Sequence, residues 1–244
     1  MDRAVDGHLT RRAVVTAASA ALASLALGSC GRRQRWKPLS DNELNGPIET
    51  LPPRVRPSAR PTGSDSIPGV LPRREWAGGG TIESRANPMN GVRRITIHHS
   101  AVVSSGVRTR ADAARMLESI RRGHVSQQWA DIGYHYIIDP HGRIWEGRPI
   151  RFQGAHVKDN NEHNLGIMLM GNFEVERPTP AAISSLDAFV GEQMRRYNVG
   201  LRRAADKSAG VFTHQEIMST VCPGRNLQGY MIATRSSSGR LARA

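Results

Sequence analysis

Two adjacent histidines, His98 and His99, lie inside the segment RRITIHHSAV, which otherwise has the composition of a buried strand. Successive side chains of a strand point to opposite faces, so at most one of these imidazoles can easily join any given site. The pair can also be a core histidine beside a surface histidine, without chemical function. The segment alone leaves both interpretations open.

The two cysteines of the chain, Cys30 and Cys222, give a second chemical signal. A disulfide could join them. Alternatively, Cys30 is consumed by a modification near the N-terminus, and Cys222 is left single. A single thiol in an oxidising compartment is a liability unless something holds its thiolate, and a bound metal ion does so.

His214 precedes Cys222 by eight residues in the segment THQEIMSTVC. A loop of this length can fold back and place an imidazole nitrogen and a sulfur on one ion, although the spacing alone is weak evidence. A third ligand, such as one histidine of ITIHHS, gives the donor set of a catalytic zinc site, in which three protein ligands leave the fourth position to water.

Sequence periodicity predicts alternating strands and helices around these residues. Thr109 followed by Asp112 predicts a helix cap, and Thr179 followed by Pro180 predicts the start of a second helix. The turn signal at 139–142 predicts a hairpin, and the apolar run NLGIMLMG predicts a central strand covered on both faces. The predicted strands are 95–99, one on each side of 139–142, 164–171 and 210–214, and the predicted helices are 111–122 and 180–199.

These elements predict an α/β domain with a mixed central β-sheet flanked by helices. The histidine pair ends the first predicted strand, and His214 ends the last one. Cys222 lies in the loop that follows. We therefore expect these side chains to converge at one edge of the sheet.

Composition and charge limit the classes of function. The 244 residues are 39% hydrophobic, enough for one sizeable core, so we expect one domain with appendages. The net charge of +13 predicts attraction to polyanions. No helix-turn-helix, RNA-binding or zinc-finger motif is apparent, and basic residues are scattered over the whole chain. No nucleic-acid partner is expected, and an anionic cell envelope fits the charge at least as well.

The N-terminus has the layout of an export signal. Arg11 and Arg12 precede an uncharged stretch over 13–27, which is short for a permanent membrane span. The arginine pair suggests the twin-arginine route. The ending Leu-Gly-Ser-Cys resembles the lipobox of bacterial lipoproteins, which implies that Cys30 is lipidated and becomes the mature N-terminus. The alternative is an ordinary cleaved signal with an incidental cysteine.

Four regions follow from this pattern. Residues 1–29 are predicted to be the signal peptide, and 30–71 a lipidated cysteine followed by a disordered, Pro-rich linker. The folded domain is expected at 72–234, followed by a flexible tail at 235–244. The mature chain is expected to be a membrane-anchored lipoprotein that faces the cell wall or the periplasm.

The folded region also resembles a known family. The blocks ITIHHSAV, IGYHYIIDPHGRIWEGRP, GAHVKDNNEHNLGIMLMGNF and THQEIMSTVCPG are similar, in order and spacing, to peptidoglycan recognition proteins and phage lysozyme-type N-acetylmuramoyl-L-alanine amidases. The resemblance covers about three fifths of the chain, roughly 73–224. It implies that family's fold and hydrolysis of the amide between N-acetylmuramic acid and L-alanine in peptidoglycan.

The resemblance also implies roles for individual residues. Zinc is held by His98, His214 and Cys222, while His99 turns to the other side of the sheet. Tyr134 matches the catalytic tyrosine of the family. Thr220 falls where the phage enzymes carry a lysine and many animal amidases a threonine, so it is predicted to be a catalytic position.

Other matching positions are predicted to bind the glycopeptide. His156 and Asn164 fall where family members line the binding groove, and Arg148 could meet a stem-peptide carboxylate. The predicted partners are peptidoglycan or muropeptides, together with the membrane through the N-terminal lipid. The alternative function is a peptidoglycan-binding module of the same fold that does not cleave. The presence of all three zinc ligands and Tyr134 favours the enzyme.

Overall fold

The computed structural model describes residues 67–243, so the predicted export signal and Cys30 lie outside the described residues. Within this range one mixed sheet has the strand order β1-β4-β3-β5-β2-β6. The strands are β1 (Val70–Leu71), β2 (Arg94–His99), β3 (Tyr136–Ile138), β4 (Ile144–Glu146), β5 (Asn164–Leu169) and β6 (Gly210–Thr213).

The sheet combines parallel and antiparallel pairs. Strand β2 lies between β5 and β6 and is parallel to both. Strand β3 is parallel to β5 but forms an antiparallel hairpin with β4, and the short β1 pairs in parallel with β4. At the hairpin turn, Asp139 Oδ1 accepts hydrogen bonds from the backbone nitrogens of His141 and Arg143. The predicted mixed sheet and hairpin are confirmed.

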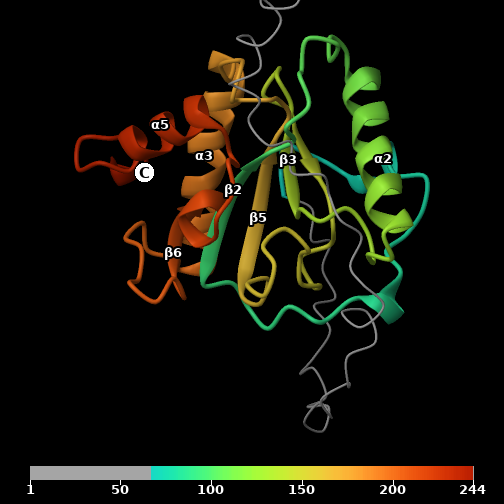
Figure 1. The fold of residues 1–244 in the computed structure, drawn as a ribbon, viewed down its shortest axis with the longest axis horizontal. Coiled ribbons are helices and arrows are strands. Elements are labelled where there is room, and N and C mark those ends of the chain that lie inside the picture. Colours follow the sequence, from blue (N-terminus) through green and yellow to red (C-terminus); the bar gives the residue numbers. More distant parts are fainter. Residues whose placement is uncertain (1–66, 244) are drawn as a thin grey trace, which may run out of the picture. The chain divides into compact units, whose positions relative to one another are not determined.

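Helices cover both faces of the sheet. Helix α2 (Arg110–Ser126) lies on one face, and α3 (Pro180–Tyr197) and α5 (Arg225–Thr234) lie on the other (Figure 1). The predicted caps are confirmed, because the Thr109 and Thr179 side chains accept hydrogen bonds from backbone nitrogens in the first turns of α2 and α3. Short helical turns are η1 (Arg73–Glu75), η2 (Glu83–Arg85), α4 (His214–Ile217) and η3 (Leu241–Arg243).

Alternation along β2 distributes its side chains between two hydrophobic cores. Ile95 and Ile97 join the core under α3 and α5. Thr96 and His98 therefore face the α2 side. The core on the α2 side includes Ala113, Leu117, Ile137, Trp145 and Met168. His98 therefore lies, fully buried, on the α2 face at the carboxyl end of a central strand.

The predicted domain boundaries need correction at both ends. Val70–Leu71, expected in the linker, pairs with β4, and Ile67 is buried in the core under α3. The expected flexible tail is packed as well. Arg235 forms a two-bond ion pair with Glu216, and Leu241 is 2% exposed in the same core. Local composition did not reveal these contacts because they join segments distant in sequence.

The helices of residues 67–243 include none with both the length and the apolar composition needed to cross a bilayer.

Candidate metal centre

Three candidate ligands converge from separate parts of the sheet edge. His98 comes from the end of β2, His214 begins α4 directly after β6, and Cys222 lies in the loop between α4 and α5. Their candidate ligand atoms all lie within 4.8 Å of one another. His98 Nδ1 is 3.7 Å from Cys222 Sγ, and the His98 and His214 ring centroids are 4.7 Å apart. The three residues can therefore share one ion.

His99 lies on the opposite face of the sheet. Its Nδ1 accepts a hydrogen bond from the backbone nitrogen of Phe173 at 3.2 Å, and its ring centroid is 6.2 Å from that of Phe173. Only its backbone reaches the cluster, where its N–H donates to Cys222 Sγ at 3.4 Å. The alternation of β2 thus separates the two imidazoles.

The segment between His214 and Cys222 folds back as its length allows. The backbone nitrogen of Gln215 donates to the Cys222 carbonyl oxygen at 2.8 Å, which closes the loop on itself. Thr220 accepts a hydrogen bond from the Cys222 backbone nitrogen at 3.2 Å. At the other end, the Thr213 backbone nitrogen donates to Glu216 Oε2 at 2.8 Å at the start of α4. These bonds fix the thiol relative to the imidazole.

Burial determines the protonation of the cluster. Burial, with further contributions from His156, His214 and His99, holds the pKa of His98 well below 6.5. Burial, assisted by His99, lowers the pKa of His214 to about 4. Both imidazoles are therefore neutral at pH 7, the form that ligates metals. Burial raises the pKa of the Cys222 thiol to about 12, and a bound cation reverses this preference because it stabilises the thiolate.

The donor set fits a zinc ion. His214 Nε2 is buried and has no hydrogen-bond partner among the described residues. A buried ring nitrogen without a protein partner is unusual, and metal coordination satisfies it. Two neutral imidazoles and one thiolate are borderline-soft ligands typical of catalytic zinc sites, where a fourth position stays open to water.

Tyr134 lies beside the three ligands. Its ring centroid is 5.2 Å from that of His98, and burial, with the nearby Cys222, raises the pKa of its phenol. On its other side lies His124 from α2, with ring centroids 6.1 Å apart. No sequence motif marks His124, which lies near the end of α2.

The three predicted glycopeptide-binding residues are buried. Arg148 is 3% exposed, and its guanidinium donates to the carbonyl oxygens of Ile132, Gln153 and Asp131. This geometry does not fit the predicted contact with a stem-peptide carboxylate, because the donors already bind the backbone. Asn164 is fully buried and bonded within the protein, and His156 is buried against His98. All three side chains are thus buried and make hydrogen bonds within the protein.

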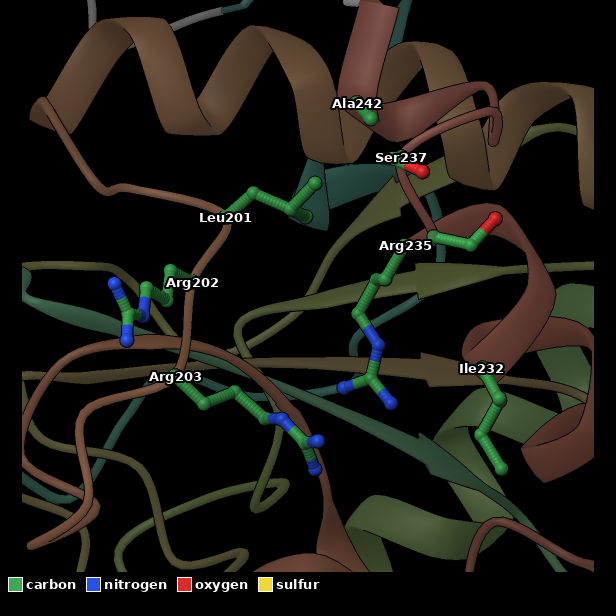
Figure 2. Close-up of a pocket in the computed structure, with 8 residues that line it drawn as sticks. Leu201, Arg202, Arg203, Ile232, Arg235, Ser237 and Ala242 are labelled. Atoms are coloured by element: carbon green, nitrogen blue, oxygen red, sulfur yellow. The ribbon is translucent and has the colours of Figure 1, made fainter.

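A separate hollow lies elsewhere in the described region. It has a volume of about 600 Å³ and lies between the segment before β6 and the end of α5 (Figure 2). Arg202, Arg203 and Arg235 line it, but none of the three candidate ligands does. Glu216 forms ion pairs with both Arg203 and Arg235, so it offsets one of these three positive charges.

Fold and site together define an α/β domain with a metal-ligand cluster at the carboxyl edge of its central sheet. The N-acetylmuramoyl-L-alanine amidase family matches residues 87–225, more than half of the chain. The chain belongs to this family, and the match includes all three candidate ligands. The predicted resemblance and its fold are confirmed.

Individual relatives come from animals and bacteria. Peptidoglycan-recognition protein SC2 of Drosophila melanogaster is 29% identical over 159 residues, 65% of this chain and 82% of that protein. An N-acetylmuramoyl-L-alanine amidase of Sus scrofa is 30% identical over 161 residues, 64% of this chain and 26% of that protein.

Solved structures give the same similarity. Peptidoglycan recognition protein-LE, in complex with tracheal cytotoxin, a monomeric diaminopimelic acid-type peptidoglycan, superposes with a TM-score of 0.60 at 26% identity, covering 73% of this chain and 100% of that chain. The N-acetylmuramoyl-L-alanine amidase LysC from Clostridium intestinale superposes with a TM-score of 0.52 at 26% identity. The superposition covers 64% of this chain and 93% of that chain.

Proposed function

We propose that the chain is a zinc-dependent N-acetylmuramoyl-L-alanine amidase, which hydrolyses the amide between N-acetylmuramic acid and the L-alanine of peptidoglycan stem peptides. The observation that carries this proposal is the convergence of His98, His214 and Cys222 from three elements, with candidate ligand atoms within 4.8 Å of one another. The proposed partners are peptidoglycan and muropeptides. The complex of the related recognition protein-LE with a monomeric peptidoglycan supports this choice.

The residues of the site have complementary roles in this reaction. When bound, zinc lowers the pKa of a water molecule towards about 7 and polarises the scissile carbonyl. His98 and His214 contribute neutral lone pairs, and Cys222 contributes one negative charge. Because burial raises the pKa of Tyr134, its phenol stays protonated and can donate a hydrogen bond to the carbonyl oxygen as negative charge develops there. Thr220 holds the Cys222 backbone.

The second candidate function is a binding module that recognises muropeptides without cleaving them. Several related proteins are named for recognition and not for hydrolysis. The complete set of three candidate ligands, with Tyr134 beside it, favours the enzyme because binding alone does not require a metal-ligand cluster.

Digestion of purified sacculi tests the proposal. We expect the purified chain to contain about one zinc ion and to release peptides that begin with L-alanine, identified by mass analysis. Chelation should stop the release, and added zinc should restore it. Binding to sacculi without release identifies the recognition module. Full activity after exhaustive chelation, with no metal found, excludes the zinc mechanism.

We also propose that the chain is exported through the twin-arginine route and anchored by a lipid on Cys30, facing the cell wall or the periplasm. Support comes from Arg11 and Arg12, the uncharged stretch over 13–27 and the ending Leu-Gly-Ser-Cys.

A further inference from the structure

His156 uses both of its ring nitrogens inside the protein. Its Nδ1 lies 3.0 Å from Nε2 of His98, a residue 58 positions away in the sequence. Its Nε2 lies 3.1 Å from the backbone carbonyl oxygen of Asn164 at the start of β5. The side chain is in the interior, since His156 is only 7% exposed. These contacts connect the protein backbone to a candidate metal ligand through one imidazole.

The chemistry of these contacts fixes where the protons lie. A carbonyl oxygen can only accept, so Nε2 of His156 carries a proton and donates it to Asn164. Both rings are buried, and no carboxylate of the described residues bonds to either ring, so neither ring holds a second proton and both are neutral. A neutral ring with a proton on Nε2 has its lone pair on Nδ1. His98 Nε2 must therefore donate to His156.

This proton arrangement leaves the lone pair of His98 on Nδ1. That atom is the one 3.7 Å from Cys222 Sγ, on the side of the candidate ligand cluster. The opposite tautomer of His98 would place two lone pairs against each other at 3.0 Å and a proton towards the cluster. The hydrogen-bond chain thus selects the tautomer that can ligate a metal.

Two glycines make room for the His156 ring. A Cβ atom at Gly154 would lie 2.3 Å from His156 Cδ2, and one at Gly166 would lie 2.5 Å from the same atom. Neither distance is compatible with a side chain. Gly166 belongs to β5, opposite Thr96 of β2 in the pairing register. Without a side chain there, the ring can lie directly against the sheet beside His98.

Neighbouring asparagines hold both ends of this arrangement. Asn161 Oδ1 accepts from the backbone nitrogens of His156 and Val157, at 2.9 and 3.0 Å. The Asn164 side chain accepts from the Thr96 hydroxyl at 2.7 Å and donates to the Asn160 carbonyl oxygen at 2.8 Å. The carbonyl oxygen that fixes the His156 tautomer therefore has little freedom to move.

We propose that His156 is a positioning residue that orients His98 and fixes its Nδ1 as the metal-ligating atom. His156 acts through His98. This role takes the place of the glycopeptide contact that the sequence predicts for His156. The proposal rests on the proposed zinc function. Partners that orient a metal-bound histidine contribute about 10- to 100-fold to metal affinity, and a similar contribution is expected here.

The tautomers can be observed without any metal. Long-range nitrogen–proton NMR correlations of the metal-free full chain distinguish a neutral histidine protonated on Nε2 from one protonated on Nδ1. We expect both His98 and His156 to be protonated on Nε2. In His156→Leu, His98 should lose this fixed preference. A wild-type His98 protonated on Nδ1 would overturn the proposal at once.

Zinc affinity supplies the second readout, measured by competition with a chromophoric chelator. We expect His156→Leu to bind Zn²⁺ about 10- to 100-fold more weakly. His156→Asn should recover most of the affinity, because its amide oxygen occupies nearly the position of Nδ1 and can accept from His98. His141→Leu is the control: His141 Nε2 also lies within hydrogen-bond distance of a backbone carbonyl oxygen, that of Val107 at 3.2 Å, but among the described residues His141 makes no hydrogen bond or ring contact with the three candidate ligands or with His156.

The outcomes separate this proposal from the proposed function. Wild-type affinity in His156→Leu, or an equal loss in His141→Leu, refutes the positioning role while leaving zinc binding intact. A wild-type chain that binds no zinc refutes the zinc function, and the NMR correlations still decide whether His156 fixes His98. If His156→Leu does not fold, the wild-type tautomers and the affinity of His156→Asn decide the question.

Discussion

At the residue scale, a substitution at Cys222 distinguishes an enzyme from a recognition module. Cys222→Ala removes the only thiolate from the candidate ligand set, so zinc should bind much more weakly and peptide release should fall by orders of magnitude. The sheet that frames the site does not depend on the thiol, so muropeptide binding should change far less. Peptide release and calorimetric binding are measured on both proteins. Cleavage by the variant at the wild-type rate contradicts the mechanism.

A substitution at Tyr134 tests the stabilisation of the transition state without changing the three candidate ligands. Tyr134→Phe keeps the ring that lies beside His98 and His124 but removes the hydroxyl. Loss of one oxyanion donor typically lowers the rate about 10²- to 10³-fold. We expect that loss in the rate of peptide release, with the zinc content unchanged by elemental analysis. A variant that retains the full rate shows that the hydroxyl has no catalytic role.

At the element scale, Glu216 joins α4 to the end of α5 and to the segment before β6. It accepts from the Thr213 backbone nitrogen at 2.8 Å and forms ion pairs with Arg235 and Arg203, each at 2.7 Å. Burial alone raises the pKa of Glu216, but the Arg235 hydrogen bond and the other partners lower it to about 2. The folded state therefore prefers the ionised carboxylate.

The sign of the pH dependence follows from this depressed pKa. The stabilisation from Glu216 is present above its ordinary pKa of 4.5 and is lost as the pH falls towards about 2. Glu216→Gln should lower the free energy of unfolding at pH 7 by roughly 1–3 kcal/mol and by a smaller amount at pH 3, where part of the stabilisation is already lost. Denaturant titrations at both pH values measure the difference. The control Glu162→Gln, at a side chain 62% exposed, should have little effect at either pH.

Much of the secondary structure could be predicted from the sequence because it depends on interactions between residues close together in the chain. Thr109, Thr179 and Pro180 mark helix starts through bonds within one turn, and alternation along β2 separates His98 from His99. The bond between His98 and His156 could not be predicted, because it joins residues 58 positions apart and depends on the space that Gly154 and Gly166 leave for the ring. Helix α5 and strand β1 were also missed: the first has no side-chain cap, and the second has only two residues.

At the scale of the whole molecule, the C-terminal residues are expected to stabilise the domain. Leu241 is 2% exposed in the core under α3, and Arg235 is tied to Glu216 by two hydrogen bonds. Leu241→Ala should lower the free energy of unfolding by about 2–5 kcal/mol. Deletion of all residues after Thr234 should lower it further, since it also leaves Glu216 without Arg235. Unchanged denaturant midpoints for both variants contradict the packing of this segment.

The anchoring proposal is tested on the intact chain in a bacterial host that carries the twin-arginine system. If a lipid on Cys30 is the anchor, Cys30→Ser should leave the membrane fraction, because the Pro-rich linker offers no other apolar anchor. Equal membrane retention of Cys30→Ser contradicts the lipid.

The proposed export route has a physical reason and a control of its own. Passage in the folded state allows zinc to capture Cys222 in the reducing cytoplasm, before an oxidising compartment can modify the thiol. The double variant Arg11→Lys, Arg12→Lys keeps the charge but should block export. The matched pair Arg32→Lys, Arg33→Lys makes the same change just beyond Cys30 and should be exported normally. Export is measured by fractionation. Normal export of the Arg11→Lys, Arg12→Lys variant contradicts the twin-arginine route, because this variant differs from the unchanged sequence only in its guanidinium pair.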